Sequence, residues 1–139
     1  MANAEKKIEK PLPRPAPESR AFWEGTKARK LMLPRCDACG RFWFPPSGRC
    51  PHCLSLNFGW HETKGEGRIY SFVVYHRVYH PGFEGEVPYV VAIVELDEGP
   101  RLITNIVDAP EKVRCDARVR VHFVDAGPDV VLPKFALLT

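Results

Sequence analysis

The fold of this 139-residue chain is decided by the stretch PRCDACGRFWFPPSGRCPHC, residues 34–53. It contains two Cys-x2-Cys pairs with ten residues between them. Each pair turns the chain so that two sulfurs point at one place, and two such turns complete a tetrahedral thiolate site. The spacing therefore predicts one Zn²⁺ ion, held by Cys36, Cys39, Cys50 and Cys53.

The residues around the cysteines favour a structural metal. Gly40, directly after the first pair, can adopt the positive φ that turns backbone N–H groups toward the sulfurs. Leu54 stands at the equivalent place after the second pair, where glycine would be a better match. Four cysteines leave no open coordination position, which is typical of structural zinc. Iron in a rubredoxin-like electron carrier is the alternative, because an all-sulfur tetrahedron suits both metals.

Upstream of the cysteines, the chain predicts an extended arm and a short helix. Residues 1–18 contain four alternating prolines, which exclude a helix and favour a stiff arm that either stays in solvent or wraps around a partner. Residues 19–30 predict a helix with Ser19 as N-cap. This helix is too short to bury Phe22 and Trp23 alone, so these side chains pack on the rest of the chain or dock on another protein.

Downstream of the cysteines, the hydrophobic period changes to two, as in β-strands. Turn residues separate five such segments, which are 67–80, 88–96, 101–107, 117–124 and 130–138. Short strands at this spacing predict a small closed barrel, because closure removes exposed edges. Pro133 predicts an edge position for the last strand. The expected domains are an arm (1–18), a helix with a zinc ribbon (19–60) and a barrel (61–139).

The order of motifs resembles the DUF35 family over residues 19–138. The matching features are Phe22-Trp23-Glu24-Gly25, the four cysteines, Pro45-Pro46, Gly65, Gly67 and Pro88-Tyr89. The resemblance implies a mainly β fold with a short N-terminal helix, a rubredoxin-like zinc ribbon and a small OB-fold β-barrel. Cys115-Asp116 departs from the family pattern, which tends to carry a glycine turn there, and this puts the local turn in doubt.

The resemblance also implies a role in acyl-CoA metabolism. Members of the family are non-catalytic partners of thiolases, of hydroxymethylglutaryl-CoA synthase or of hot-dog-fold hydratases. Their OB-fold helps bind acyl-CoA, while the ribbon and helix dock on the larger subunit. The expected function is therefore that of an accessory subunit in a thiolase-type complex that cleaves a carbon–carbon bond with coenzyme A. Benzoylsuccinyl-CoA is one such substrate.

The residues themselves contain no recognisable catalytic constellation. Cys115 is the fifth cysteine, and neither a glycine-rich turn nor a histidine cluster surrounds it, as a nucleophile would require. Coenzyme A requires cations for its phosphates. The candidates in or near the predicted strands are Arg68, Arg77, Arg101 and Lys134.

Composition bears on the remaining alternatives. OB barrels and zinc ribbons also bind nucleic acids, and Tyr70, Phe72 and Tyr75 could stack on bases. A net charge of +3, with Lys and Arg scattered, is weaker than such binding usually needs. The sequence has neither an apolar run of about 18 residues nor the apolar core of a secretory signal. A cytoplasmic location is expected.

Overall fold

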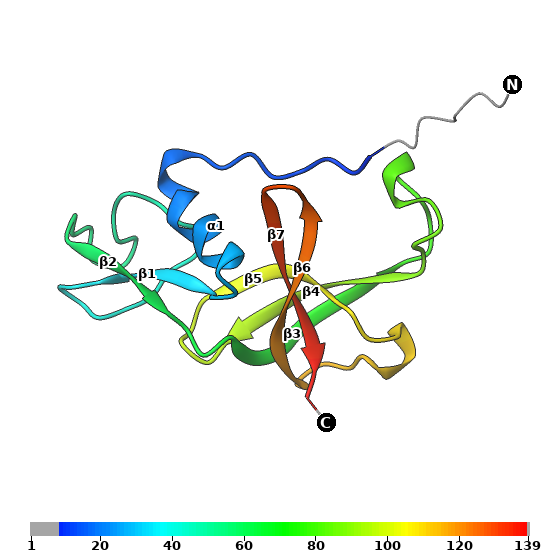
Figure 1. The fold of residues 1–139 in the computed structure, drawn as a ribbon. Coiled ribbons are helices and arrows are strands. Elements are labelled where there is room, and N and C mark those ends of the chain that lie inside the picture. The colour runs from blue at the N-terminus through cyan, green and yellow to red at the C-terminus, as the bar shows by residue number, and fades with distance from the viewer. Residues whose placement is uncertain (1–8, 139) are drawn as a thin grey trace, which may run out of the picture.

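The computed structural model describes residues 9–138, with the ribbon at one end and the barrel at the other (Figure 1). One α-helix, α1, spans Arg20–Lys27. Three 3₁₀ turns lie at Pro17–Ser19, Pro81–Phe83 and Pro110–Lys112. The strands are β1 (Met32–Cys36), β2 (Phe58–Glu62), β3 (Glu66–Tyr75), β4 (Tyr89–Leu96), β5 (Arg101–Ile106), β6 (Arg118–Gly127) and β7 (Val130–Leu137).

Five strands close into a barrel in the order β3-β4-β5-β7-β6, which confirms the predicted OB-fold. Two expectations were wrong. β3 ends at Tyr75, five residues early, because the chain leaves the sheet there for a long loop. β7 is not at an edge: it lies between β5 and β6, and the Pro133 carbonyl accepts a hydrogen bond from Thr104 Oγ1 of β5 at 2.8 Å. Closure therefore places the proline-containing strand inside the sheet.

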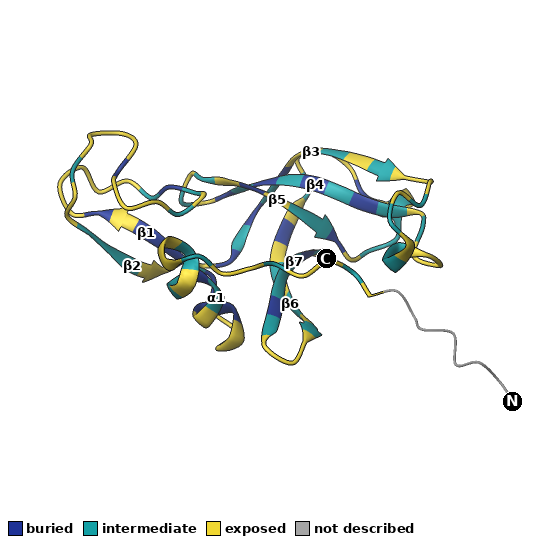
Figure 2. Ribbon diagram, turned by 90° about the horizontal axis from the view of Figure 1, so that it is seen from above, coloured by how far each residue is buried: buried dark blue, intermediate teal, exposed yellow. Residues whose placement is uncertain are grey.

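The core joins the ribbon to the barrel. β4 alternates strictly between buried and half-buried residues, so that one face fills the barrel (Figure 2). Phe22 of α1 and Leu31 and Leu33, next to and in β1, belong to the same buried cluster as Ile69 and Phe135 of the barrel. Because this cluster is continuous, the barrel and the ribbon depend on each other for burial.

Steric constraints explain why two positions of the family pattern are glycine. A Cβ at Gly67 would overlap the carbonyl oxygen of Glu95 and lie 2.9 Å from the carbonyl carbon. Gly65 has a φ of 70°, and a Cβ there would lie 2.5 Å from Cγ1 of Val121. Both glycines let β3 approach its neighbouring strands closely enough to pair with them.

The seam between β3 and β6 is the shortest antiparallel ladder of the barrel, with three register pairs. The Arg118 guanidinium binds the Asp97 carboxylate through two bonds of 2.7 and 2.8 Å, and Arg120 binds Glu66 at 2.8 Å. Asp116, in the turn before β6, adopts a φ of 67°. The aspartate thus takes the glycine-like conformation that the family pattern leads one to expect there.

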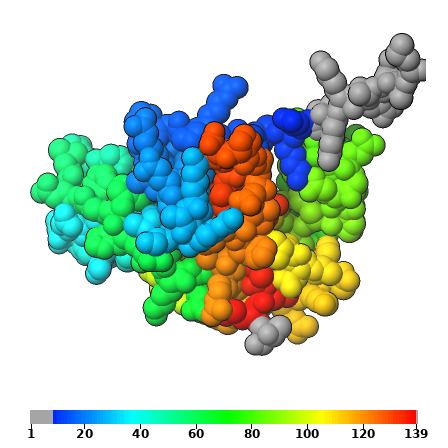
Figure 3. Space-filling model, viewed as in Figure 1, coloured from blue at the N-terminus to red at the C-terminus, as the bar shows by residue number. Residues whose placement is uncertain are grey.

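The described part of the arm runs along the chain's own barrel (Figures 1 and 3), and most of its residues stay exposed to solvent. At Gly82, an added Cβ would lie 2.8 Å from the backbone of Lys10. The Lys10 ammonium pairs with Glu86 at 2.5 Å, and Leu12 contacts the turn at Gly127. Residues 1–8 of the predicted arm lie outside the described residues.

Helix α1 is shorter than predicted and ends in a Schellman motif. The Lys30 N–H donates to the Gly25 carbonyl at 2.9 Å, and Arg29 adopts a φ of 62° at the C′ position. Ser19 occupies the N-cap position, but its hydroxyl bonds to the backbone of Ala16 instead of the helix. A Cβ at Gly25 would lie 2.6 Å from Met32, so this glycine permits the close approach of α1 to β1.

Candidate metal centre and ligand surfaces

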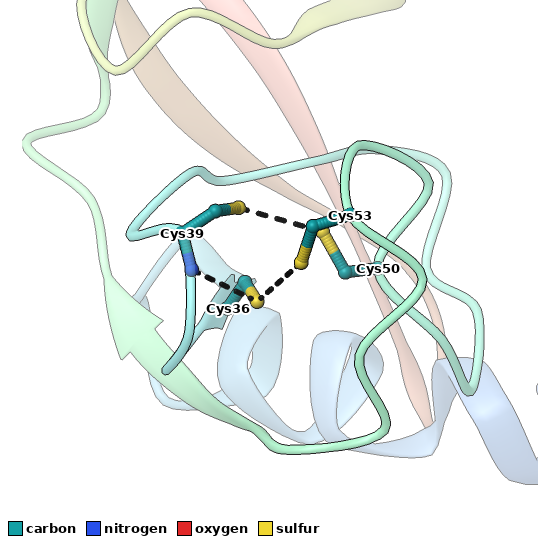
Figure 4. A group of neighbouring side chains, drawn as sticks. All are labelled: Cys36, Cys39, Cys50 and Cys53. Atoms are coloured by element: carbon teal, nitrogen blue, oxygen red, sulfur yellow. Dashed lines mark hydrogen bonds between the residues drawn. The ribbon is translucent and has the colours of Figure 1, made fainter.

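Two backbone turns of the same design present the four cysteines (Figure 4). In the first turn, the Gly40 N–H donates to the Cys36 carbonyl at 2.9 Å. In the second, the Leu54 N–H donates to the Cys50 carbonyl at the same distance. Gly40 has a φ of 75°, as predicted, and Leu54 adopts 65° at the equivalent position. The local turn geometry therefore comes from the Cys-x2-Cys spacing in both copies.

The sulfur positions fit a tetrahedral metal ion. The Cys36 and Cys53 sulfurs lie 3.5 Å apart, those of Cys39 and Cys50 lie 3.7 Å apart, and all four are within 4.8 Å of one another (Figure 4). Zinc–sulfur bonds of about 2.3 Å give sulfur–sulfur edges of about 3.8 Å in a regular tetrahedron. The structure thus brings together all four predicted ligands in a closed, structural arrangement.

Backbone donors adjust the protonation of these sulfurs. The Cys39 N–H points at the Cys36 sulfur, 3.4 Å away, and lowers the pKa of Cys36 to about 6. The Ser55 N–H acts to lower the pKa of Cys53, but hydrogen bonding to the neighbouring thiols and burial raise it to about 12. A bound Zn²⁺ supplies the positive charge that lets all four sulfurs be thiolates.

A small apolar core holds the ribbon around the sulfurs. Cys36, Cys50 and Trp43 are buried together, with Phe58 packed against them. The Trp43 and Phe58 rings meet edge to face at 5.1 Å, and Trp43 Nε1 donates to Ser47 Oγ at 3.1 Å. The aromatic insert between the cysteine pairs therefore packs the ribbon.

Two of the four candidate coenzyme A cations, Arg68 and Arg101, lie together, and carboxylates neutralise both. Arg68 pairs with Asp116 and, at 3.1 Å, with Glu95, and these hydrogen bonds raise the pKa of Arg68. Arg101 binds the other oxygen of Glu95 at 3.0 Å, and its hydrogen bond is the main cause of the lowered pKa of Glu95. Neither cation is free for a phosphate in this arrangement.

The other two candidates, Arg77 and Lys134, lie apart from this pair. Arg77 sits in the loop after β3, over the ring of Tyr79. Lys134 of β7 is half-buried in a cavity of about 350 Å³, whose lining includes Tyr89 and the carboxylates of Glu86 and Asp108. Burial lowers the pKa of Lys134, with a further contribution from Lys10, and the charge of Glu86 acts in the opposite direction. Within residues 9–138, neither Arg77 nor Lys134 forms an ion pair.

The two candidate docking residues differ in exposure. Phe22 is 2% exposed and packs in the chain's own core, so it is not accessible to a partner in this conformation. Trp23 is half-buried and meets Phe22 edge to face at 5.0 Å. Trp23 therefore remains the candidate for docking from α1. Cys115 is exposed, and among the described residues its thiol has no hydrogen-bond partner.

Sequence reasoning missed an apolar surface on the outside of the barrel. Tyr79 is 73% exposed and Ile103 is 77% exposed. The alternation in the strands identified one apolar face for the core, but outward apolar residues were indistinguishable from core residues until the register was known. In the part of the chain that the structure describes, no helix is long and apolar enough to span a membrane.

Family models match adjacent parts of the chain. The rubredoxin-like zinc ribbon domain of ChsH2 matches residues 23–59, and the C-terminal OB-fold domain of ChsH2 matches residues 60–124. The match to the ribbon, with its four neighbouring cysteines, confirms the prediction of structural zinc. A solved chain of the Ltp2-ChsH2(DUF35) aldolase superimposes with a TM-score of 0.82 and 40% identity, covering 91% of this chain and 98% of that one.

Curated relatives include subunits of acyl-CoA enzymes. A probable enoyl-CoA hydratase alpha subunit of Thermomonospora curvata is 45% identical over 88% of this chain, which spans only 39% of that relative. Subunit BbsA of the benzoylsuccinyl-CoA thiolase of Thauera aromatica is 30% identical over 63% of this chain and 58% of the relative. A DUF35 domain-containing scaffold protein of Methanocaldococcus jannaschii is 38% identical over 73% of both chains. Ribbon, barrel and sequence together show that the chain belongs to the DUF35 family.

Proposed function

We propose that this chain is a non-catalytic, zinc-stabilised accessory subunit of a thiolase-type complex that cleaves a carbon–carbon bond in an acyl-CoA. The observation that carries the accessory-subunit role is the match with the DUF35 chain of a solved aldolase, and the similarity to a benzoylsuccinyl-CoA thiolase subunit supports the thiolase reaction. The match to the hydratase alpha subunit covers less than half of that relative.

The chemistry of the chain supports a non-catalytic role. The metal shell is closed by four sulfurs, so it offers no position for a substrate or a water molecule. Cys115, the remaining thiol, is exposed and has no hydrogen-bonded base within residues 9–138. The nucleophile and the acid–base groups of the reaction therefore belong to the partner.

For the acyl-CoA itself, Lys134 is the candidate contact. Its ammonium group is half-buried in a cavity and has no ionic partner in the described chain. Arg68 and Arg101 are already held by Glu95. A phosphate or carboxylate of the ligand would supply the direct ion pair that Lys134 lacks and offset its desolvation, against the opposing charge of Glu86 and Asp108 in the cavity lining.

Replacing Lys134 with Ala tests this assignment. The affinity of the purified complex for its acyl-CoA should fall roughly tenfold, because a hydrogen bond to a charged group contributes about 1.5 kcal/mol. Lys112→Ala removes the same charge from an exposed 3₁₀ turn and is the control. Equal affinities of the two variants, measured by titration calorimetry, would exclude Lys134 from the ligand site.

A hydratase complex is the second candidate, because the Thermomonospora relative has the highest identity of those described here. Affinity purification of the tagged chain from its native extract, followed by mass spectrometry, separates the two. A thiolase-like protein in near-equal amount supports the proposal. Recovery of a hydratase would change the proposed reaction and leave the accessory role unchanged. Recovery of nucleic acid, or of no acyl-CoA enzyme, contradicts both.

A further inference from the structure

The outer surface of β3, β4 and β5 carries a set of mostly apolar side chains, with Ser71 beside Ile93 and Asn105 beside Val91 as polar members. The register places Val73 beside Val91 and Ile93 beside Ile103. Val73 is 53% exposed and Ile103 is 77% exposed, and exposed and half-buried residues alternate along the second half of β3 (Figure 2). We call the apolar part of this set the apolar sheet face. Its members are Val73, Tyr75, Tyr89, Val91, Ile93 and Ile103.

Aromatic rings extend this face into the loop between β3 and β4. The Tyr75 ring meets Tyr89 at 5.2 Å and Tyr79 at 5.8 Å, and Tyr89 stacks on Phe83 at 5.5 Å. Tyr79, at 73% exposure, presents most of its side chain to solvent. Such mutually packed rings lose little side-chain entropy on binding, and tyrosine is enriched in the centres of protein interfaces.

The charges at the other end of the face cancel. Arg68 and Arg101 are paired with Glu95 and Asp116, two cations with two carboxylates. Single-stranded nucleic acid binds to OB-folds through free cations beside stacking rings. Here, Arg101 lies over the Tyr70 ring at 3.8 Å, so the cation already covers the aromatic surface that a base would use. At the aromatic end, the cation Arg77 forms no ion pair within the described residues and already lies over the Tyr79 ring. The otherwise uncharged mixture of aliphatic and aromatic side chains on this face favours a protein.

The dimensions of the face favour a larger protein over a second copy of the chain. Three strands spaced about 4.8 Å apart and about six residue steps long give a face of roughly 14 by 20 Å, or about 300 Å². Two such faces pressed together would bury roughly 600 Å² in total, about half the minimum for a stable complex. A larger partner can also contact the aromatic loop and reach the required area.

We propose that the catalytic subunit of the complex docks on the apolar sheet face. Its contact surface is apolar over Val73 and Ile103 and carries a carboxylate opposite Arg77, which has no ion pair within the described residues. This inference rests on the function proposed above and names the interface through which it operates. It adds the barrel surface to the docking expected from the ribbon and α1.

The test is the substitution Ile103→Asp, with Leu138→Asp as the matched control. Both residues are exposed and apolar, but Leu138 follows β7, away from the apolar sheet face. A carboxylate buried in an apolar interface should weaken binding to the purified catalytic subunit by about a hundredfold. Leu138→Asp should bind as the unmodified chain does. Val73→Lys, on a different strand, provides a second variant if Ile103→Asp fails to fold.

Each outcome of the binding measurement decides a different claim. If the unmodified chain recovers an acyl-CoA enzyme and the Ile103→Asp and Val73→Lys variants recover it equally, the docking surface is wrong while the proposed function stands. If the unmodified chain recovers no such enzyme, the proposed function and this occupant both fail. Self-association or oligonucleotide binding that Ile103→Asp abolishes would assign the face to those occupants and overturn the proposal.

Arg77→Glu tests the predicted carboxylate of the partner. Reversal of a rim charge changes mainly the association rate and its dependence on salt. The rate should fall about tenfold at low ionic strength, and this difference should shrink as salt is added. If Arg77→Glu associates at the unmodified rate at low salt, the partner has no carboxylate opposite Arg77.

Discussion

Leu54 adopts a backbone conformation that its side chain disfavours, because it occupies the place that Gly40 holds in the other cysteine turn. Its φ of 65° lies in the left-handed region, which costs a residue with a Cβ about 1 kcal/mol or more. The side chain is 65% exposed, so it recovers little of this through burial. The second turn forms even though leucine disfavours this backbone conformation. The conformation is needed to bring the sulfurs together and to let the Leu54 N–H donate to the Cys50 carbonyl.

Leu54→Gly should therefore stabilise the zinc-loaded protein by about 0.5 kcal/mol, the relief of backbone strain minus the extra entropy of glycine in the unfolded chain. Leu56→Gly is the control, since Leu56 is 64% exposed and has no positive φ. That variant should lose about 0.5–1 kcal/mol. Urea denaturation measures both. An equal loss in the two variants would show that no strain is stored at Leu54.

Gly67 has the opposite role, because a side chain there would meet backbone. The clash is with the carbonyl group of Glu95 on the paired strand, and this group cannot move without separating β3 from β4. Gly67→Ala should cost about 3 kcal/mol of unfolding free energy. Gly48→Ala, where a Cβ would meet nothing within 4 Å, should change stability by less than about 1 kcal/mol. Thermal unfolding of both variants checks the difference, and similar melting temperatures would contradict it.

At the scale of elements, closure of the barrel depends on the short seam between β3 and β6. Three register pairs join the two strands, and the Arg118–Asp97 ion pair lies beside them. The hydrogen bonds from Arg118 lower the pKa of Asp97 below its ordinary value. The carboxylate is about one third exposed, so the pair contributes no more than about 1 kcal/mol.

A depressed carboxylate pKa makes the contribution of this seam depend on pH. The stabilisation is complete above the unfolded pKa of about 4 and is lost as pH falls through the lower folded value. Asp97→Asn should therefore be less stable than the unmodified protein at pH 7 and equally stable near pH 2. Asp129→Asn, at an exposed aspartate with no ion pair among residues 9–138, should show no such convergence. A constant difference between pH 7 and 2 would rule out the Asp97 pairing.

At the scale of the whole molecule, the metal ribbon and the barrel stabilise each other. Phe22, Leu31 and Leu33 are buried against barrel residues, and β1 continues directly into the first cysteine turn. Zinc binding to such ribbons provides about 10–16 kcal/mol of apparent folding free energy. Loss of the metal should therefore also destabilise the barrel.

Cys50→Ser should release the zinc, expose Trp43 and lower the melting temperature of the barrel, because Cys50 is fully buried beside that ring. Atomic spectroscopy measures the metal, and the red shift of tryptophan fluorescence measures the exposure. Cys115→Ser, at an exposed site outside the cluster, should keep one zinc per chain and change stability by less than about 0.5 kcal/mol. A zinc-free but normally stable Cys50→Ser protein would show that the ribbon does not depend on its metal.

Local patterns predicted the ligands of the metal and most of the strands. The Cys-x2-Cys spacing placed four sulfurs within 4.8 Å of one another, and the period of two located all five barrel strands, although β3 ended early. The arm and Phe22 could not be placed in this way. Their contacts, at Gly82 and in the barrel core, join residues that are far apart in the chain.

The zinc ligands, the strand segments and the family could be predicted from the amino-acid sequence, because each depends on residues that lie close together in the chain or on their order. Which cations form ion pairs depends on contacts between distant parts of the chain, so it could be learned only from the folded protein. Arg68 and Arg101 look like Lys134 in the sequence, but barrel closure and strand register bring carboxylates into direct contact with the first two. Lys134 forms no ion pair in the described chain, although Glu86 and Asp108 line the same cavity. The same register gathers outward apolar residues of β3, β4 and β5 into one surface.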